Sequence, residues 1–193
     1  VSLDLAYLHR QYGAHASVLR IGGRAVMYAY DSYHIPAAEW ARVLVAGGDL
    51  SARGAAHDAF VIGLWLERAH GAELAAGGFD GAYTYFASDG ASHGATAARW
   101  PELAAFCAAR GLLFVPSVGP GYNDEKIRPW NAAATKSREA GGYYDRMWAR
   151  ALDARAAVVS VTSYNEWGEG TQIEPAAPRA VPLPAGADDD ANG

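Results

Sequence analysis

Four apolar runs of strand length recur along the chain, and each is followed by polar or aromatic residues. They span residues 24–30, 78–85, 112–118 and 156–162. A continuous run of about four to eight apolar residues is typical of a strand that is buried on both faces, as in a parallel sheet. The runs therefore predict four parallel strands at the centre of the molecule.

Segments with the apolar spacing of helices lie between these runs. Apolar residues in 103–110 recur three and four positions apart, and Gly111 follows where a left-handed residue often ends a helix. A second such segment covers 144–152, and a third runs over about 58–70. Strands that alternate with helices indicate βαβ units, so the sequence predicts an α/β fold.

The chain beyond residue 175 has a different character. Prolines recur there and lead into three consecutive aspartates, with few large apolar residues. Such a segment cannot bury enough apolar surface to fold, so we expect 176–193 to be a disordered tail. The rest of the chain holds four strands, half the number in a (β/α)8 barrel of about 250 residues. We therefore expect about half of such a barrel.

Composition and charge exclude several classes of function. The 193 residues include 16 Lys and Arg against 21 Asp and Glu, a net charge of −5, and the basic residues are scattered. Binding to nucleic acid or to an anionic membrane surface requires clustered basic residues, so we expect neither. No stretch approaches the ~20 consecutive apolar residues of a membrane span, and no signal-peptide pattern is visible.

The sequence offers little support for a metal or cofactor. Asp31 with His34 and Asp89 with His93 are the right residue types for a metal, but neither pair has a third ligand at an informative spacing. Cys107 lies on the apolar side of a predicted helix, where a thiol behaves as a small hydrophobic group. We expect no metal site, no cofactor and no cysteine nucleophile.

Two glutamates follow the fourth apolar run. Glu166 and Glu169 flank Trp167 and Gly168, and Asn165 precedes them. Barrel enzymes place catalytic groups at this end of a strand, and a tight turn brings residues three apart within about 5–6 Å. When two carboxyl groups lie this near each other, one can act as an acid and the other as a base, as in glycosidases. The alternative is a solvated loop with two surface glutamates.

Two other strand ends carry similar groups. Asp31 and Tyr33 follow the first run, whereas Tyr122, Arg128 and Trp130 follow the third. Carboxyl ends of parallel strands meet at one rim, so these side chains are expected to converge there with the glutamates. Taken singly, each cluster also fits an ordinary loop with capping residues.

Five ordered motifs together resemble the glycoprotein endo-alpha-1,2-mannosidases of glycoside hydrolase family 99. The resemblance runs from about residue 5 to residue 175. Its motifs are YDSYH (30–34), FDGAYTYFAS (79–88), FVPSVGPGYND (114–124), IRPWN (127–131) and SYNEWGEGTQIE (163–174). It implies that 1–175 form part of a (β/α)8 TIM-barrel catalytic domain whose N-terminal half is missing, and that 176–193 lie outside that domain.

The resemblance also implies an activity. Family members cleave an internal alpha-1,2-mannosidic bond of glucosylated high-mannose N-glycans and release Glc-Man with retention. By the family pattern Glu169 is the general acid/base, and Glu166 assists the 2-hydroxyl of the substrate as it attacks C1 to give a 1,2-anhydro sugar. The substrate-binding residues are then Asp31, Tyr33, Tyr85, Tyr122, Arg128, Trp130, Asn165 and Trp167.

Location and partners also come from the resemblance alone. Animal members resemble Golgi membrane proteins with a lumenal catalytic domain and one N-terminal anchor, which is absent from this sequence. The partner is then a high-mannose N-glycan or another alpha-mannoside. One position departs from the animal pattern, because Gly168 stands where those members usually carry His.

Two alternatives remain at this stage. The chain is also consistent with a non-catalytic truncated remnant that binds glycans weakly. The second alternative keeps the enzyme and changes the substrate to an alpha-1,3-glucan, because endo-alpha-1,3-glucanases share the barrel. The same pair of carboxyl groups is also compatible with a covalent glycosyl-enzyme intermediate.

Overall fold

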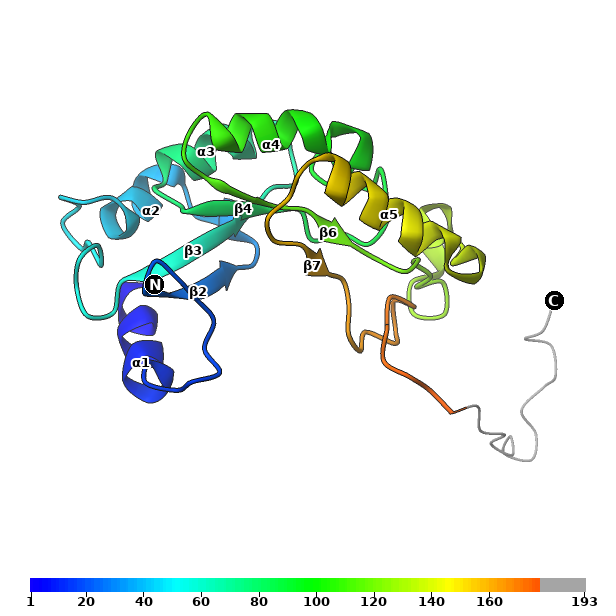
Figure 1. Ribbon diagram of the computed structural model, residues 1–193, viewed down its shortest axis with the longest axis horizontal. Coiled ribbons are helices and arrows are strands. Elements are labelled where there is room, and N and C mark those ends of the chain that lie inside the picture. Colours follow the sequence, from blue (N-terminus) through cyan, green and yellow to red (C-terminus); the bar gives the residue numbers. More distant parts are fainter. Residues whose placement is uncertain (178–193) are drawn as a thin grey trace.

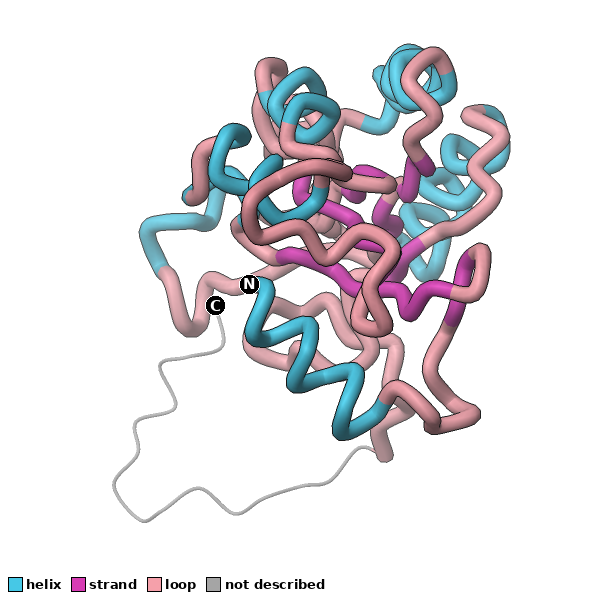
Figure 2. The backbone as a smooth tube through the Cα atoms, turned by 90° about the vertical axis from the view of Figure 1, so that its left-hand side faces the viewer, coloured by secondary structure: helices cyan, strands magenta, loops and turns pink. Residues whose placement is uncertain are grey.

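The chain forms an arch in the computed structural model, which describes residues 1–177 (Figure 1). The predicted disordered tail of 176–193 therefore lies outside the described residues, except for its first two. Helices cover the convex side of a curved sheet, and Figure 2 shows them on one side of the strands. These helices are α2 (Ala37–Leu44), α3 (His70–Ala76), α4 (Trp100–Ala108) and α5 (Gly142–Asp153).

The strands pair in parallel except at one edge. The order of the larger sheet is β1-β2-β3-β4-β5, and only β1 runs antiparallel to its neighbour. β6 and β7 form a separate parallel pair. The strands are β1 (Arg20–Ile21), β2 (Arg24–Ala29), β3 (Ala59–Leu64), β4 (Gly81–Tyr83), β5 (Leu113–Val115), β6 (Ser117–Val118) and β7 (Ser160–Val161). Each predicted apolar run contains at least one strand, so the parallel α/β prediction is confirmed.

The helix predicted over 58–70 is wrong. Residues 59–64 form β3, which pairs with β2 on one side and β4 on the other. The apolar residues there are continuous, and both faces of the strand are used. Val61 packs into the core beneath the helices, whereas Ile62 and Leu64 belong to a cluster on the other face. The run is continuous because both faces of this strand are buried. The helix begins only beyond it, as α3.

The third apolar run divides at Pro116. Proline has no amide hydrogen to donate, so a sheet ladder cannot continue through it. β5 ends just before Pro116 and β6 begins just after it, in different sheets. The Pro116 carbonyl instead accepts a hydrogen bond of 3.0 Å from the amide of Ser160. This break turns the chain from the five-stranded sheet to the pair that leads to the glutamates.

The main core lies between the sheet and the convex helices. Trp100, Leu103 and Cys107 of α4 and Met147 of α5 are almost fully buried there. The predicted helices over 103–110 and 144–152 are confirmed as α4 and α5 with shifted ends. Gly111 takes a φ of +69° just beyond α4, as the C-cap prediction requires. Burial raises the pKa of the Cys107 thiol to about 12, which agrees with a packing role.

The concave side carries a second and smaller apolar cluster. Ile62, Leu64, Tyr83 and Val115 form its buried part, and α1 (Ser2–Tyr12) lies on this side near β2, opposite the other helices (Figure 2). Short 3-10 helices complete the chain at Ser32–His34, Ala97–Arg99, Pro129–Ala134 and Glu139–Gly141. No helix within residues 1–177 is both long and apolar enough to cross a membrane.

Candidate active site

The two glutamates lie on a tight turn beyond β7. The amide of Gly170 donates to the Trp167 carbonyl at 3.2 Å, and the amide of Thr171 donates to the Glu166 carbonyl at 3.2 Å. Gly170 has a φ of +61°, and a Cβ there would come within 3.0 Å of the Asn123 carbonyl oxygen. Glycine is therefore needed where this turn crosses the loop after β6. The turn predicted from the spacing is present.

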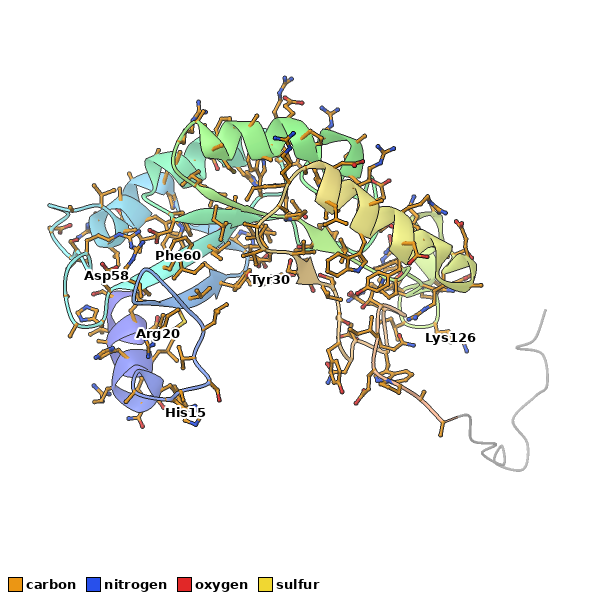
Figure 3. The ribbon with its side chains drawn as sticks, in the orientation of Figure 1. His15, Arg20, Tyr30, Asp58, Phe60 and Lys126 are labelled. Atoms are coloured by element: carbon orange, nitrogen blue, oxygen red, sulfur yellow. The ribbon has the colours of Figure 1, made fainter. Side chains whose placement is uncertain are left out.

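A pocket of about 400 Å³ brings the glutamates together with the strand ends. Its tyrosines come from β2, β4 and the turn after β4, and its small hydroxyl side chains come from β6, β7 and the residues after β7. Tyr30, at the end of β2, lies near the middle of the arch in Figure 3. The pocket is lined by Tyr28, Tyr83, Tyr85, Ser117, Ser160, Val161, Thr162, Ser163, Asn165, Glu166 and Glu169.

The two carboxylates are held differently. Oε1 of Glu169 pairs with Nη1 of Arg128 at 2.9 Å, and the Glu169 side chain is 20% exposed. The Glu169 carbonyl accepts a hydrogen bond of 2.8 Å from the amide of Asn123. Glu166 is exposed, and its Oε1 accepts a hydrogen bond of 3.1 Å from the amide of Gly168. One carboxylate is therefore fixed by a cation and the other by its own turn.

A fully buried aspartate organises the loop that reaches Glu169. Asp124 Oδ2 accepts hydrogen bonds from the Tyr122 hydroxyl at 2.8 Å and from Arg128 Nη1 at 3.0 Å, and Asn131 donates to both carboxylate oxygens. Burial alone would raise the pKa of Asp124, but these donors and the charge of Arg128 outweigh it and keep that pKa low. Arg128 thus bridges Asp124 and Glu169.

The tyrosines near the glutamates remain neutral donors across the ordinary pH range. Burial raises the pKa of Tyr85 to about 12, and nearby Tyr30 and the charge of Glu169 add to the effect. Burial also raises the pKa of Tyr122 to about 12, together with the hydrogen bond to Asp124. A neutral phenol beside a carboxylate can donate a hydrogen bond to a substrate oxygen, and the carboxylate can exchange a proton with that oxygen.

The predicted binding residues divide into four pairs, of which three lie near the glutamates or on the exposed surface and the fourth lies apart. Tyr85 and Asn165 line the pocket, and Tyr122 and Arg128 contact the network behind Glu169. Trp130 is 82% exposed and Trp167 is 48% exposed. The Trp167 indole donates to Glu174 at 2.9 Å.

Asp31 and Tyr33 form a separate cluster at the end of β2. The Tyr33 hydroxyl donates to Asp31 at 2.9 Å, and the Tyr33 ring stacks on His70 with centroids 5.1 Å apart. Neither side chain lines the pocket with the glutamates. The structure therefore brings part of the predicted set together and places this pair on a neighbouring part of the rim.

Sequence reasoning misses several contributors to the pocket and its support. Tyr28 and Tyr83 fall inside predicted strands and carry no predicted role, although Tyr83 and Tyr85 stand two apart at a strand end. That spacing places residues on one face of a strand and is a usable signal. Asp124 and Asn131 stand inside two of the motifs, but nothing in the sequence identifies Asp124 as fully buried.

Comparison with known proteins assigns the family. The model of glycosyl hydrolase family 99 matches residues 1–185. The chain belongs to this family of glycoside hydrolases. The glycoprotein endo-alpha-1,2-mannosidase-like protein of Danio rerio is 42% identical over 181 residues, which cover 91% of this chain and 41% of that relative. The glycoprotein endo-alpha-1,2-mannosidase of Xenopus laevis is also 42% identical, over 91% of this chain and 40% of that relative.

Solved structures agree on the fold. The family 99 endo-alpha-mannosidase from Bacteroides thetaiotaomicron superposes with a TM-score of 0.90 at 42% identity, covering 93% of this chain and 52% of that one. The same enzyme in complex with bis-tris propane gives a TM-score of 0.89. The arch is therefore part of a TIM barrel, as predicted. The chain spans about two-fifths to one half of the length of these relatives.

Proposed function

We propose that this chain supplies the carboxylate pair and one wall of a site that cleaves internal alpha-1,2-mannosidic bonds of glucosylated high-mannose N-glycans. One observation carries the proposal: Glu166 and Glu169 line a single pocket at the carboxyl end of a parallel sheet. Catalytic groups of TIM-barrel enzymes lie at this end. Relatives named glycoprotein endo-alpha-1,2-mannosidases support the choice of bond, and the resemblance of the sequence motifs supports the choice of glycan.

The proposed reaction retains configuration in two steps. Glu166 takes the proton of the substrate 2-hydroxyl while its oxygen attacks C1, and Glu169 gives a proton to the departing sugar oxygen. This forms a 1,2-anhydro sugar. Glu169 then takes a proton from water as the water attacks C1, and Glu166 returns a proton to the 2-oxygen. The ion pair with Arg128 suits the stage at which Glu169 is ionised.

We assign roles to the residues around the two glutamates according to how exposed they are. Trp130 and Trp167 present aromatic faces at the rim, which suits stacking against sugar rings. Asn165, Tyr85 and Tyr122 offer polar groups next to the carboxylates. Asp31 and Tyr33 then bind a more distant part of the glycan. We also propose that residues 1–175 form the catalytic domain and that the protein acts in the Golgi lumen.

A graft tests the proposal directly. Residues 1–177 replace the matching half of the Bacteroides thetaiotaomicron enzyme, and Glc-Man release from a glucosylated high-mannose glycan is measured. The unmodified 193-residue chain is assayed alongside. We expect release by the graft, and Glu169→Gln should lower its rate by about 10²–10⁴-fold, the usual contribution of general acid/base catalysis. Glu125→Gln, an exposed loop residue outside the pocket, serves as the matched control.

Two outcomes would contradict the proposal. A folded graft that releases nothing shows that this half does not carry a working pair. Release that survives Glu169→Gln within tenfold removes the assigned role. Preferential cleavage of an alpha-1,3-glucan by the same graft keeps the carboxylate pair and changes the substrate.

A second candidate is a glycan-binding remnant without catalysis. It is favoured by the exposed aromatic faces of Trp130 and Trp167, which can stack against sugar rings without any catalysis. Bis-tris propane, a cationic polyol found in a solved relative, offers a probe that needs no turnover. Calorimetric binding that weakens in Glu166→Gln and Glu169→Gln, together with no release from the graft, would favour this candidate.

A further inference from the structure

Tyr85 lies at the centre of an unusual three-residue turn directly after β4. The amide of Phe86 donates to the carbonyl of Thr84 at 2.8 Å, and Tyr85 between them has a φ of +61°. A three-residue turn with a positive φ at its centre is the rare and strained form. A tyrosine holds such a conformation only where its surroundings over-determine it.

Two side-chain hydroxyls bind both backbone polar groups of Tyr85. The Tyr85 amide donates to Ser117 Oγ at 2.7 Å, and Thr162 Oγ1 donates to the Tyr85 carbonyl. Ser117 is fully buried and Thr162 is 8% exposed. The hydroxyls belong to β6 and to the residue just after β7, so they reach Tyr85 across the break that Pro116 creates.

The two hydroxyls are themselves fixed by their strands. The Ser117 amide donates to Thr84 Oγ1 at 2.9 Å, and Ser117 Oγ lies 2.6 Å from Ser160 Oγ. The Thr162 amide donates to the Val118 carbonyl at 2.9 Å. Strand pairing between β6 and β7 therefore determines where the hydroxyls stand.

The turn directs the Tyr85 ring into the pocket with the glutamates. Tyr30 packs edge-on against it at 5.0 Å between centroids, and Tyr83 lies 6.5 Å away. Glu166 and Glu169 line the same pocket, and both of their charges contribute to the raised pKa of Tyr85.

We propose that Ser117 and Thr162 are positioning residues that hold Tyr85 in its left-handed conformation and keep its phenol beside Glu166 and Glu169. The inference rests on the proposed function in one respect only, namely that a substrate contacts this phenol. In that function the phenol donates a hydrogen bond at the reacting sugar, and the two hydroxyls act only through it.

The titration of Tyr85 tests the proposal without any substrate. The full chain is labelled with fluorotyrosine, which lowers all tyrosine pKa values into an accessible range, and is followed by fluorine NMR. The Tyr85 signal is assigned with Tyr85→Phe. We expect Thr162→Val to lower the Tyr85 midpoint by about one pH unit, because a released phenol moves toward water and the ordinary tyrosine pKa of about 10. Thr162→Ser, which keeps the hydroxyl, should leave the midpoint in place.

Three controls separate positioning from packing. Ser117→Ala should lower the Tyr85 midpoint as Thr162→Val does. If Thr162→Val shows no cooperative unfolding and is therefore not properly folded, Ser117→Ala is used for the test instead. Ser88→Ala removes a buried hydroxyl that binds the Ala134 carbonyl and should leave Tyr85 unchanged. Tyr122, held by Asp124, is the internal reference.

The proposal is overturned if the Tyr85 midpoint stays unchanged in folded Thr162→Val and Ser117→Ala, or if Thr162→Ser lowers it as far as Thr162→Val. Because no turnover is measured, these outcomes are independent of whether the graft cleaves glycans. An inactive graft with the expected titration overturns the proposed function and leaves the positioning role intact.

Discussion

The two ends of the parallel sheet handle charge in opposite ways. At the amino end, Arg24 and Arg53 bind Asp58 and Asp80, with the Arg24–Asp80 contact at 2.8 Å and the Arg53–Asp80 contact at 2.9 Å. Arg53 also donates to the carbonyls of residues 44, 59 and 78. Asp58 and Tyr30, labelled in Figure 3, mark the two ends.

The carboxyl end leaves some of its charge available. Glu166 is exposed, and among residues 1–177 its carboxylate accepts a hydrogen bond from the Gly168 amide only. Glu169 pairs with an Arg128 side chain that is 41% exposed. At the amino end, both aspartates and Arg53 are at most 16% exposed. In a barrel enzyme the amino end usually serves stability and the carboxyl end serves chemistry. The contrast teaches that pairing, rather than the presence of charge, distinguishes a structural end from a reactive one.

The largest effect on stability is expected at the amino end. Asp80→Ala removes one of the two carboxylates that Arg24 and Arg53 share, so that only Asp58 faces the two cations, and it leaves the Val61 amide without its acceptor. Breaking such a buried network typically costs about 3–5 kcal/mol. Urea unfolding measures the loss, and Asp49→Asn, which breaks an exposed pair with Arg42, is the matched control and should change little. Equal losses in the two variants would contradict the comparison.

A smaller effect is expected from crowding at the carboxyl end. Gly170→Ala forces a side chain into a positive φ and against Asn123, which should cost about 1–3 kcal/mol. Gly90→Ala is the matched control, because Gly90 has a φ of +85° and a Cβ added there would meet nothing within 4 Å. Thermal unfolding should show the greater loss for Gly170→Ala. A greater loss in Gly90→Ala would show that the close approach of the two loops is unimportant.

The smallest expected effect is on stability at acid pH, and it is tested with one carboxylate from each end of the sheet. Burial alone would raise the pKa of Asp58, but the Gly54 amide and Arg53 keep it below the usual value. Asp124 at the other end also has a lowered pKa. A lowered folded pKa stabilises the protein above the unfolded value of about 3.9, and this contribution is lost as the pH falls through the folded value.

We therefore expect the unmodified chain to lose stability below about pH 4. Asp58→Asn and Asp124→Asn should each lower stability at neutral pH and flatten the loss in acid. Urea unfolding at a series of pH values measures the slopes. An acid slope that neither variant changes would show that other carboxylates dominate this range.

The sequence predicts those parts of the fold that are determined by residues close together in the chain. Apolar runs locate β2, β4, β5 and β7, because a buried strand needs continuous apolar residues. The same rule applies to 59–64, where the helical spacing is misleading. The split at Pro116 follows from a missing amide, yet Ser160, which binds the Pro116 carbonyl, is distant in sequence and no local pattern identifies it.

The site divides along the same line. Glu166, Glu169 and Asn165 lie on one turn, so their meeting at the pocket is a local consequence of spacing and glycine. Tyr85 is among the predicted binding residues, but its left-handed backbone depends on hydroxyls 32 and 77 residues away. The burial of Asp124 likewise depends on how a whole loop closes around it. Such contacts come from tertiary packing, which no local pattern encodes.

The short hairpin at the edge of the larger sheet bears on how copies of the chain meet one another. β1 covers the first residues of β2 with a strand of two residues that begins with Arg20, and Arg24 follows across the turn. A very short edge strand that carries an arginine is a poor template for a neighbouring chain, because it offers few backbone groups and the Arg20 side chains of two copies would repel each other. The same fold that opens a pocket at one end of the sheet thus discourages strand-by-strand growth along this edge, which matters most in crowded solution.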